Sequence, residues 1–206
     1  MSEPAYRRMA VDERRQQLLS LAAELFATHA FGQLSMARIA REAGISKALL
    51  YHYFPGKQEL FVATLAQAAE ELRAATEPPL DAPAPEALAH SVAAYLVWIE
   101  QHETAYRKLQ ESAGSVPEVG ALIADVRDRT ATRILDGLGA GASPPPRVRV
   151  AVRSWLWQMD GAILDWLEHR DVTREQLRDF LLGALGGGLA AAGAAELLSG
   201  QEPRAA

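Results

Sequence analysis

The chain has 206 residues, no cysteine and a formal net charge of -5 at pH 7. A chain of this length can bury a substantial core without cross-links. The missing cysteines exclude disulfides, thiolate metal sites and cysteine nucleophiles. The N-terminus lacks the apolar core of a signal peptide, and no run of roughly 18 apolar residues could span a membrane. We therefore expect a cytoplasmic protein with no membrane partner.

The charge is unevenly distributed along the chain. Residues 1–60 hold eight Lys or Arg against six Asp or Glu, a net charge of +2, whereas residues 61–206 carry a net charge of -7. A mildly basic N-terminal part on an acidic body fits a protein that touches phosphates at one end. An ordinary solvated surface would also account for +2, so charge alone does not establish nucleic-acid binding.

Helix-forming residues dominate and no alternating β-branched run occurs, so we predict an all-α fold. The first helix is expected from Asp12 to Thr28, and Phe31 and Gly32 end it. Two short helices should follow within residues 35–57. A long helix is then expected from Lys57 to Thr76, where Glu77-Pro78-Pro79 stops it.

The C-terminal part is predicted to hold five more helices. Ser115 and Glu118 have capping-box spacing and open the third of them, while Thr173 and Gln176 cap the last. The five are expected at 85–102, 103–112, 115–138, 147–170 and 173–195. The domains that we predict are residues 1–60, residues 61–199 and a flexible tail at 200–206.

The informative stretch is residues 34–57, where two short helices surround a glycine turn. Ser35 is placed to cap the first short helix and Ser46 the second. Gly44 supplies the positive φ that a sharp turn needs. Leu50 and Phe54 should anchor the second helix inward, which leaves its opposite side available. A short helix pinned from behind is what the major groove of DNA accepts.

At these residues the chain resembles the TetR family of bacterial repressors. The resemblance extends from about Arg14 to Leu65 and is carried by Ile39-Ala40, Ala43-Gly44-Ile45-Ser46, Leu50-Tyr51, Phe54, Lys57 and Leu60. It implies a three-helix helix-turn-helix head followed by a helical bundle for ligand binding and dimerisation. It also implies a homodimeric repressor that needs no cofactor, binds a pseudo-palindromic double-stranded operator and is released by a small molecule.

The resemblance further implies which positions contact DNA. Phosphate contacts are expected from Ser35, Tyr53 and Lys57, with Ser46 at the start of the second short helix. Base edges or the adjoining backbone are expected to be contacted by Lys47, Ala48, Leu49 and Tyr51. Among these, Lys47 alone suits a guanine acceptor pair, whereas Ala48 and Leu49 can contact thymine methyl groups.

Some positions in the stretch carry two interpretations. Leu49 stands where the family often has Thr, so a hydrogen bond made there in other members is in doubt. His52 either reaches a phosphate or is simply solvated. Arg38 and Arg41 lie on the outer side of the first short helix, where they either contact phosphate or belong to the ordinary charged surface.

In the family the last two long helices pair with their symmetry mates, which corresponds here to about 147–170 and 173–195. Gly183 and Gly187 are one helical turn apart, and their lack of side chains would let helices approach closely. Fraying near the C-terminus is the alternative explanation for these glycines. A two-fold dimer would let two short helices read a two-fold operator.

The C-terminal part also holds aromatic residues that could recognise an effector. Tyr95, Trp98 and His102 share one stripe of a helix. Pocket lining is expected from Trp98, His102, Tyr106 and Trp157, which suit an aromatic or lipophilic molecule. Core or dimer packing explains the same residues equally well. Asp160 would recognise a cationic effector or form an ion pair with a neighbouring arginine.

No enzyme machinery is visible. The five histidines are scattered and none forms an i, i+4 metal pair, so we predict no metal site. Neither a Gly-rich phosphate loop nor a Gly-x-Ser-x-Gly elbow occurs. The remaining alternative is a helical protein-interaction module without sequence-specific DNA binding. Packing alone does not require the exposed residues beside the Gly44 turn, which are Lys47, Tyr51 and Lys57. Their presence argues against that alternative.

Overall fold

The computed structural model describes residues 3–114, 116–141 and 143–198, with side chains from Asp12 onward. Every regular element in these ranges is a helix, which confirms the all-α prediction. The chain folds into two compact units: one holds the residues up to Glu71 together with Thr104–Leu122, and the other holds Leu72–Glu103 and the residues from Ile123 on.

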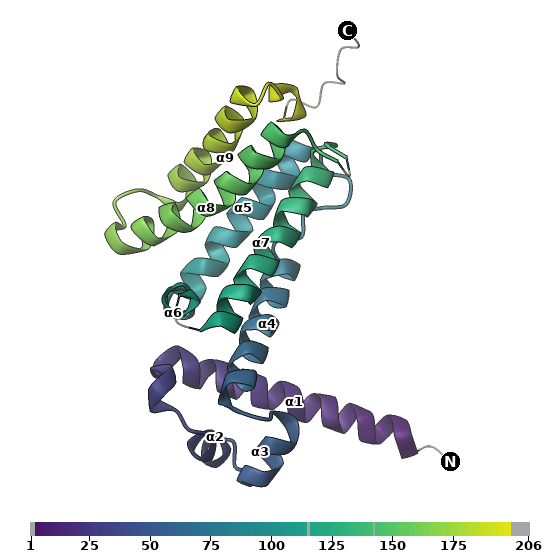
Figure 1. Ribbon diagram of the computed structural model, residues 1–206, viewed down its shortest axis with the longest axis vertical. Helices are drawn as coiled ribbons and strands as arrows, with labels where there is room; N and C mark the ends of the chain where they lie inside the picture. Colours follow the sequence, from purple (N-terminus) through teal and green to yellow (C-terminus); the bar gives the residue numbers. More distant parts are fainter. Residues whose placement is uncertain (1–2, 115, 142, 199–206) are drawn as a thin grey trace. The chain divides into compact units, whose positions relative to one another are not determined.

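The first unit begins with α1 (Glu3–Thr28), a short 3₁₀ turn (Phe31–Gln33), α2 (Met36–Glu42) and α3 (Lys47–Tyr53). The first part of α4 (Lys57–Ala75), most of α6 (Glu103–Ala113) and the start of α7 (Pro117–Gly137) complete it. Figure 1 shows α2 and α3 side by side, next to α1 and the start of α4.

The helix α1 ends at Thr28 as predicted but begins earlier than Asp12. The residues between Ala5 and Met9 are mostly good helix formers, so nothing in the sequence stops the helix there. Pro4 lies in the first turn, where a helix does not need its N–H. The N-cap character of Asp12 was therefore a misleading signal.

Three aromatic rings form the core of the first unit where α1, the 3₁₀ turn and α4 meet. The ring centroids of Phe26 and Phe61 are 4.8 Å apart, and those of Phe31 and Phe61 are 5.1 Å apart. Of the apolar residues that recur on one face of α1, Leu18, Ala22 and Phe26 are buried, and Leu21 and Leu25 are half-buried. These contacts fix the end of α1 against the start of α4.

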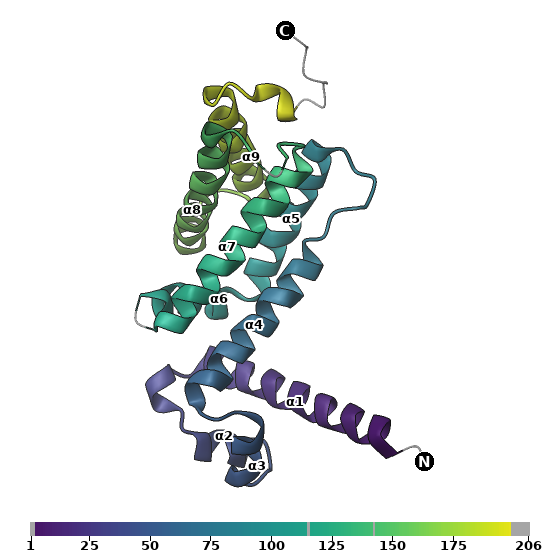
Figure 2. The same ribbon diagram turned by 45° about the vertical axis from the view of Figure 1, so that its right-hand side comes forward.

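The second unit contains α5 (Ala84–Gln101), the larger part of α7 (Pro117–Gly137), α8 (Pro146–His169) and α9 (Arg174–Ala191). Figures 1 and 2 show α5, α7, α8 and α9 stacked side by side. Each boundary lies within a few residues of its prediction. The expected Ser115 cap and the 200–206 tail lie outside the described residues.

The helices α8 and α9 pack along each other. The indole Nε1 of Trp155 donates to the carbonyl of Leu181 over 2.7 Å. Leu181, Leu185 and Leu189 are fully buried and recur along one face of α9. A Cβ built on Gly188 would lie 3.6 Å from that of Ala151, an ordinary van der Waals contact. The pair is therefore closely packed through its inner face.

The helix α9 stops before the predicted end near Ala195. Gly193 adopts φ +76°, and the N–H of Ala194 returns to the carbonyl of Leu189 over 2.9 Å. This is the usual glycine-terminated helix end. A separate 3₁₀ turn, Ala195–Leu198, follows it. The predicted capping box at the other end is confirmed, because the side chains of Thr173 and Gln176 each bond to the other's backbone N–H.

The corner between α8 and α9 is fixed by charged side chains. Arg170 has a left-handed φ of 53°, its guanidinium lies 4.5 Å from the ring centroid of Trp166, and it pairs with Glu100 and Glu103. Arg174 also pairs with Glu100. These contacts hold a conformation that a non-glycine residue rarely adopts.

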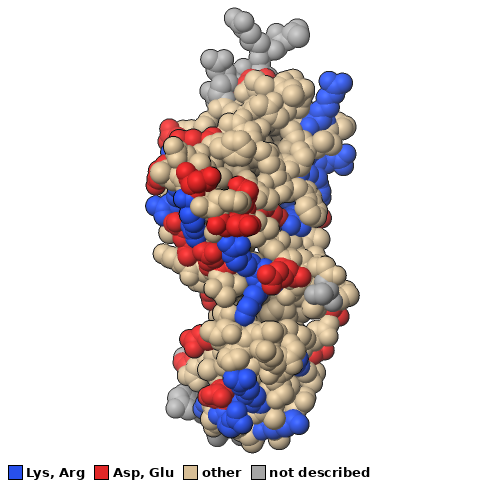
Figure 3. Space-filling model, turned by 90° about the vertical axis from the view of Figure 1, so that its left-hand side faces the viewer, with Lys and Arg blue, Asp and Glu red and all other residues tan. Residues whose placement is uncertain are grey.

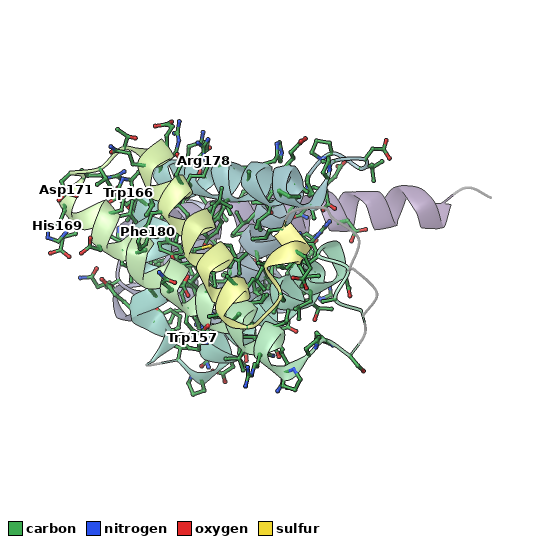
Figure 4. The ribbon with its side chains drawn as sticks, turned by 90° about the horizontal axis from the view of Figure 1, so that it is seen from above. Trp157, Trp166, His169, Asp171, Arg178 and Phe180 are labelled. Carbon is green, nitrogen blue, oxygen red and sulfur yellow. The ribbon has the colours of Figure 1, made fainter. Side chains whose placement is uncertain are left out.

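Two titratable side chains beside this corner have shifted pKa values. The pKa of His169 is raised, because its Nδ1 bonds to the Asp165 carbonyl and the Asp165 carboxylate favours the charged ring. The pKa of Glu175 is lowered, because its own backbone N–H and the hydroxyl of Thr173 donate to its carboxylate. His169 and Asp171 are labelled in Figure 4.

Candidate nucleic-acid interface

The helix α2 is short, and its start is held by a side-chain cap. The Oγ of Ser35 accepts a hydrogen bond from the N–H of Arg38 over 3.2 Å, as predicted. Met36, Ile39 and Ala40 are buried against the rest of the first unit. The opposite side of α2 is therefore the one that faces solvent.

The turn after α2 depends on one glycine. Gly44 has φ +65°, its N–H donates to the carbonyl of Arg41, and the N–H of Ile45 donates to the carbonyl of Ala40 over 3.0 Å. This pair of bonds is a Schellman motif, which satisfies carbonyls that the end of the helix leaves free. The predicted role of Gly44 is confirmed.

The helix α3 presents one buried side and one exposed side. The Oγ of Ser46 accepts from the N–H of Leu49 over 3.1 Å, and Leu50 and Phe54 are buried. Solvent-facing residues on α3 and its cap are Ser46, Lys47, Ala48, Leu49, Tyr51 and His52. The Nζ of Lys47 lies 5.6 Å from the ring centroid of Tyr51. The structure thus brings the predicted base-reading side chains together on one short helix.

Tyr53 and Lys57 are both predicted phosphate contacts, but their surroundings differ from each other. Tyr53 is half-buried, and its ring makes an edge contact with that of His52 at 5.5 Å between centroids. The Nζ of Lys57 donates to the carbonyls of Phe31 (2.7 Å) and Leu34 (2.9 Å) and lies 4.1 Å from the Phe31 ring centroid. Lys57 therefore ties the start of α4 to the connection between α1 and α2.

The two arginines of α2 also differ from each other. The Nη2 of Arg38 donates to the Nε2 of His29 over 2.8 Å, which links α2 to the end of α1. Arg41 is exposed and lies 3.6 Å from the carboxylate of Glu42. Lys and Arg side chains gather at the lower end of the face in Figure 3, which holds the α2–α3 region of Figure 1.

The predicted effector residues differ from one another in their surroundings. The rings of Trp98 and His102 stack with centroids 4.1 Å apart, while Tyr106 is buried. The indole of Trp157 is 66% exposed, and the guanidinium of Arg127 lies 3.9 Å from its ring centroid. Arg127 also pairs with Asp160, so the ion-pair interpretation of that carboxylate is the one that the structure bears out.

Taken together, α2, the Gly44 turn and the half-buried α3 define a helix-turn-helix protein, a class that inserts its second helix into the major groove of DNA. Residues 18–64 match the family model described as bacterial regulatory proteins of the tetR family. Residues 84–185 match that of the tetracycline repressor-like C-terminal domain. The chain belongs to the TetR family of transcriptional regulators.

Solved structures support the same assignment over most of the chain. A TetR-family transcriptional regulator from Streptomyces coelicolor superposes with a TM-score of 0.80 at 30% identity, covering 93% of this chain and 90% of that one. A TetR-like regulator from Rhodococcus has a TM-score of 0.64 at 25% identity, covering 86% and 96%. Family membership confirms the prediction of a regulator in place of an enzyme.

Characterised relatives match over shorter stretches. The transcriptional activator FasR of Mycolicibacterium smegmatis is 34% identical over 107 residues, which is 51% of this chain and 49% of FasR. The nucleoid occlusion factor SlmA of Haemophilus influenzae is 38% identical over 63 residues, which is 30% of this chain and 29% of SlmA. This chain therefore spans about half of FasR and less than a third of SlmA.

The Gly44 turn allows a direct test. An alanine at 44 would have to keep a left-handed φ, which costs about 1–2 kcal/mol and is partly offset by a stiffer unfolded chain. We expect Gly44→Ala to lower the free energy of unfolding by about 1 kcal/mol in urea denaturation followed by circular dichroism. Gly32→Ala is the matched control, because Gly32 has no positive φ and open space around it. Equal stabilities of the two variants would contradict the assigned role.

Proposed function

We propose that this protein is a cytoplasmic, ligand-responsive repressor that binds a pseudo-palindromic operator as a homodimer and is released by a small molecule. The observation that carries the proposal is the two-sided character of α3. Its back is buried through Leu50 and Phe54, while Lys47 and Tyr51 face solvent beside each other. A packing hairpin has no need of that exposed pair.

We assign the reading of bases to the exposed side of α3. The ammonium of Lys47 can donate to the guanine acceptors of the major groove, and the Tyr51 hydroxyl can bond to bases or to the adjoining backbone. Ala48 and Leu49 present only carbon, so they would contact thymine methyl groups. Leu49 is 39% exposed, which suits such a contact.

Phosphates would be held by residues at the edges of the motif, namely Ser35, Ser46, His52, Tyr53 and Lys57. Ser35 and His52 are exposed, so a phosphate can reach them. Lys57 is half-buried, and two of its three N–H bonds go to the carbonyls of Phe31 and Leu34. Its third N–H remains for a phosphate, which makes Lys57 both a structural tie and a backbone contact.

A head with one exposed lysine on its reading helix discriminates modestly, so two heads are needed for a specific site. We propose α8 and α9 as the dimer seam. Three large apolar side chains on these helices are exposed: Val150 (59%), Trp157 (66%) and Phe180 (57%). Figure 4 labels Trp157 on α8 and Phe180 on α9. Val150 and Trp157 are two turns apart and share a side of α8.

The glycines of α9 fit the same seam. Phe180, Gly183 and Gly187 recur at helical spacing, and all three are exposed. A Cβ built on Gly183 or Gly187 meets nothing within 4 Å in this chain, unlike one on Gly188, which meets Ala151. The face of α9 that holds these two glycines is thus turned away from the protomer's own helices, and a partner helix could approach it closely.

Release by an effector needs a link between body and head. We propose that α4 provides it, since one continuous helix contributes residues to both units. An aromatic or lipophilic effector would contact Trp98 and His102, whose stacked rings form a flat surface. For Trp157, its exposure favours the dimer seam over an effector pocket.

Activation is the second candidate for the direction of control. FasR, which is 34% identical over its matched half, is named a transcriptional activator. The two directions are separated by in vitro transcription from the bound promoter. Repression predicts fewer transcripts as the protein is added, and more again when the effector follows.

The DNA-contact model predicts that Lys47→Ala and Tyr51→Ala each raise the operator dissociation constant about 5- to 150-fold, the equivalent of losing about 1–3 kcal/mol. Fluorescence anisotropy on promoter fragments from the protein's own genomic neighbourhood would measure this. Both variants should keep the unfolding midpoint of the unmodified chain.

Arg129→Ala serves as the charge-matched control, because Arg129 lies on the exposed surface of α7 and pairs with Asp125. Its operator affinity should be unchanged. Binding should also weaken steeply as salt rises, because each phosphate contact releases counterions. Salt-independent binding, or unchanged affinity in the Lys47 and Tyr51 variants, would refute the assignment and favour a protein-interaction module.

The dimer model predicts that Phe180→Glu or Trp157→Glu shifts the protein from dimer to monomer in sedimentation velocity. A charge at either position would have to leave water for the seam, which is costly even at position 157, where Arg127 lies nearby. Leu80→Glu is the matched control, since Leu80 is fully exposed between α4 and α5. A dimer that survives both substitutions would place the seam elsewhere.

The effector model predicts that Trp98→Ala weakens the response to an effector more than it weakens operator binding. A thermal-shift screen of flat aromatic and fatty compounds would first identify a stabilising compound. The variant should lose most of that stabilisation and keep its operator affinity within about twofold. The reverse pattern would assign Trp98 to the core.

A further inference from the structure

The C-terminal end of α1 is capped by a lysine from α6. The Nζ of Lys108 donates to the carbonyls of Phe26 (3.2 Å), Ala27 (2.6 Å) and His29 (3.2 Å). The last carbonyls of a helix lack partners within it and carry its partial negative charge. An ammonium has three N–H bonds, so this single side chain can serve all three carbonyls.

The capped end of α1 also holds α2. The Nε2 of His29 faces the Nη2 of Arg38 at 2.8 Å. A guanidinium can only donate, so Nε2 must be the accepting nitrogen and the ring hydrogen lies on Nδ1. That nitrogen faces the carbonyl of Leu25 at 3.2 Å and the hydroxyl of Thr28 at 2.9 Å. His29 is thus fixed by the last turn of α1, and its contact with Arg38 holds α2 to that turn.

A second lysine acts on the same connection. Lys57 of α4 donates to the carbonyls of Phe31 and Leu34, just before α2 begins. The segment 29–34 is therefore held at its start by an ammonium from α6 and at its end by an ammonium from α4. The backbone that aims α2, and through the Gly44 turn α3, is bounded by these two sets of bonds.

We propose that Lys108 is the positioning residue through which α6 sets the orientation of the α2–α3 pair. A displacement of α6 by about 1 Å would stretch the two 3.2 Å bonds beyond the hydrogen-bonding range. Loss of the cap loosens the last turn of α1, and with it the His29–Arg38 contact that holds α2.

Because α6 directly follows α5 in the chain, a molecule bound at the end of α5 can displace α6. The helix begins at Glu103, and only His102 separates it from α5. His102 stacks on Trp98, so a molecule that wedges against this pair acts on the junction from which α6 starts. The inference rests on the proposed function for its output, which is the affinity for operator DNA.

The test uses Lys108→Met in the full chain, because methionine keeps a long apolar stem and removes the charge and all three donors. Hydrogen exchange of the free protein is measured by mass spectrometry, alongside operator affinity. We expect exchange in residues 26–42 to become at least tenfold faster and operator affinity to fall about tenfold. Protection in α8 and α9 should be unchanged.

Three further comparisons sharpen the result. Arg129→Met removes an exposed charge from α7 and should change neither readout. In a double-mutant cycle, adding Arg38→Met to Lys108→Met should cost much less operator affinity than Arg38→Met alone, since both changes break the same chain of contacts. The amide of Lys108→Gln can donate to fewer carbonyls than the ammonium, so this variant should also make hydrogen exchange faster. It takes the place of Lys108→Met if the methionine variant does not fold.

The outcomes separate this inference from the proposed function. Exchange is measured without DNA, so unchanged exchange in residues 26–42 would overturn the coupling whatever the protein binds. Faster exchange with additive losses in the cycle would also overturn it. An unmodified chain that binds no promoter fragment would refute the proposed function, while the exchange result would still decide whether Lys108 holds α2.

Discussion

The helix α3 has only seven residues, and a helix of that length does not persist in water on its own. Its existence depends on the burial of Leu50 and Phe54 behind it, with the Ser46 cap in front. Every other feature of the head serves this constraint. Gly44 lets the chain turn sharply enough for the two anchors to reach the core, where α3 packs against α2 and the guanidinium of Arg15 on α1 lies 5.3 Å from the Phe54 ring centroid.

The three lysines of the chain divide the work of the head between them. Lys47 is exposed on α3, while Lys57 directs its ammonium onto carbonyls of the connection between α1 and α2. Lys108 directs its ammonium onto carbonyls at the end of α1 and onto that of His29. The net positive charge of the first 60 residues is therefore a poor measure of the DNA-facing surface. Part of it supports the geometry of that surface from behind.

Local signals predicted much of this molecule. Helix starts could be predicted from capping side chains, namely those of Ser35, Ser46 and the Thr173–Gln176 box. The turn could be predicted from Gly44, because a residue without a Cβ readily adopts a positive φ. Long-range contacts left no such trace. Lys108 meets carbonyls about eighty residues earlier in the chain, and carbonyls carry no sequence signature. Aromatic spacing likewise could not tell the exposed Trp157 from the buried Trp155, because both suit an amphipathic helix.

The face of α9 that holds Gly183 and Gly187 has a consequence for how this protein can evolve. Glycine is the smallest residue, so at Gly183 and Gly187 every substitution adds volume and none removes it. In the proposed dimer, a substitution at either position pushes the partner helix away, and a compensating change must come from the opposite side of the seam. Duplicated copies of the gene could therefore stop pairing with each other after very few mutations, which would let two regulators separate while their reading helices were still the same.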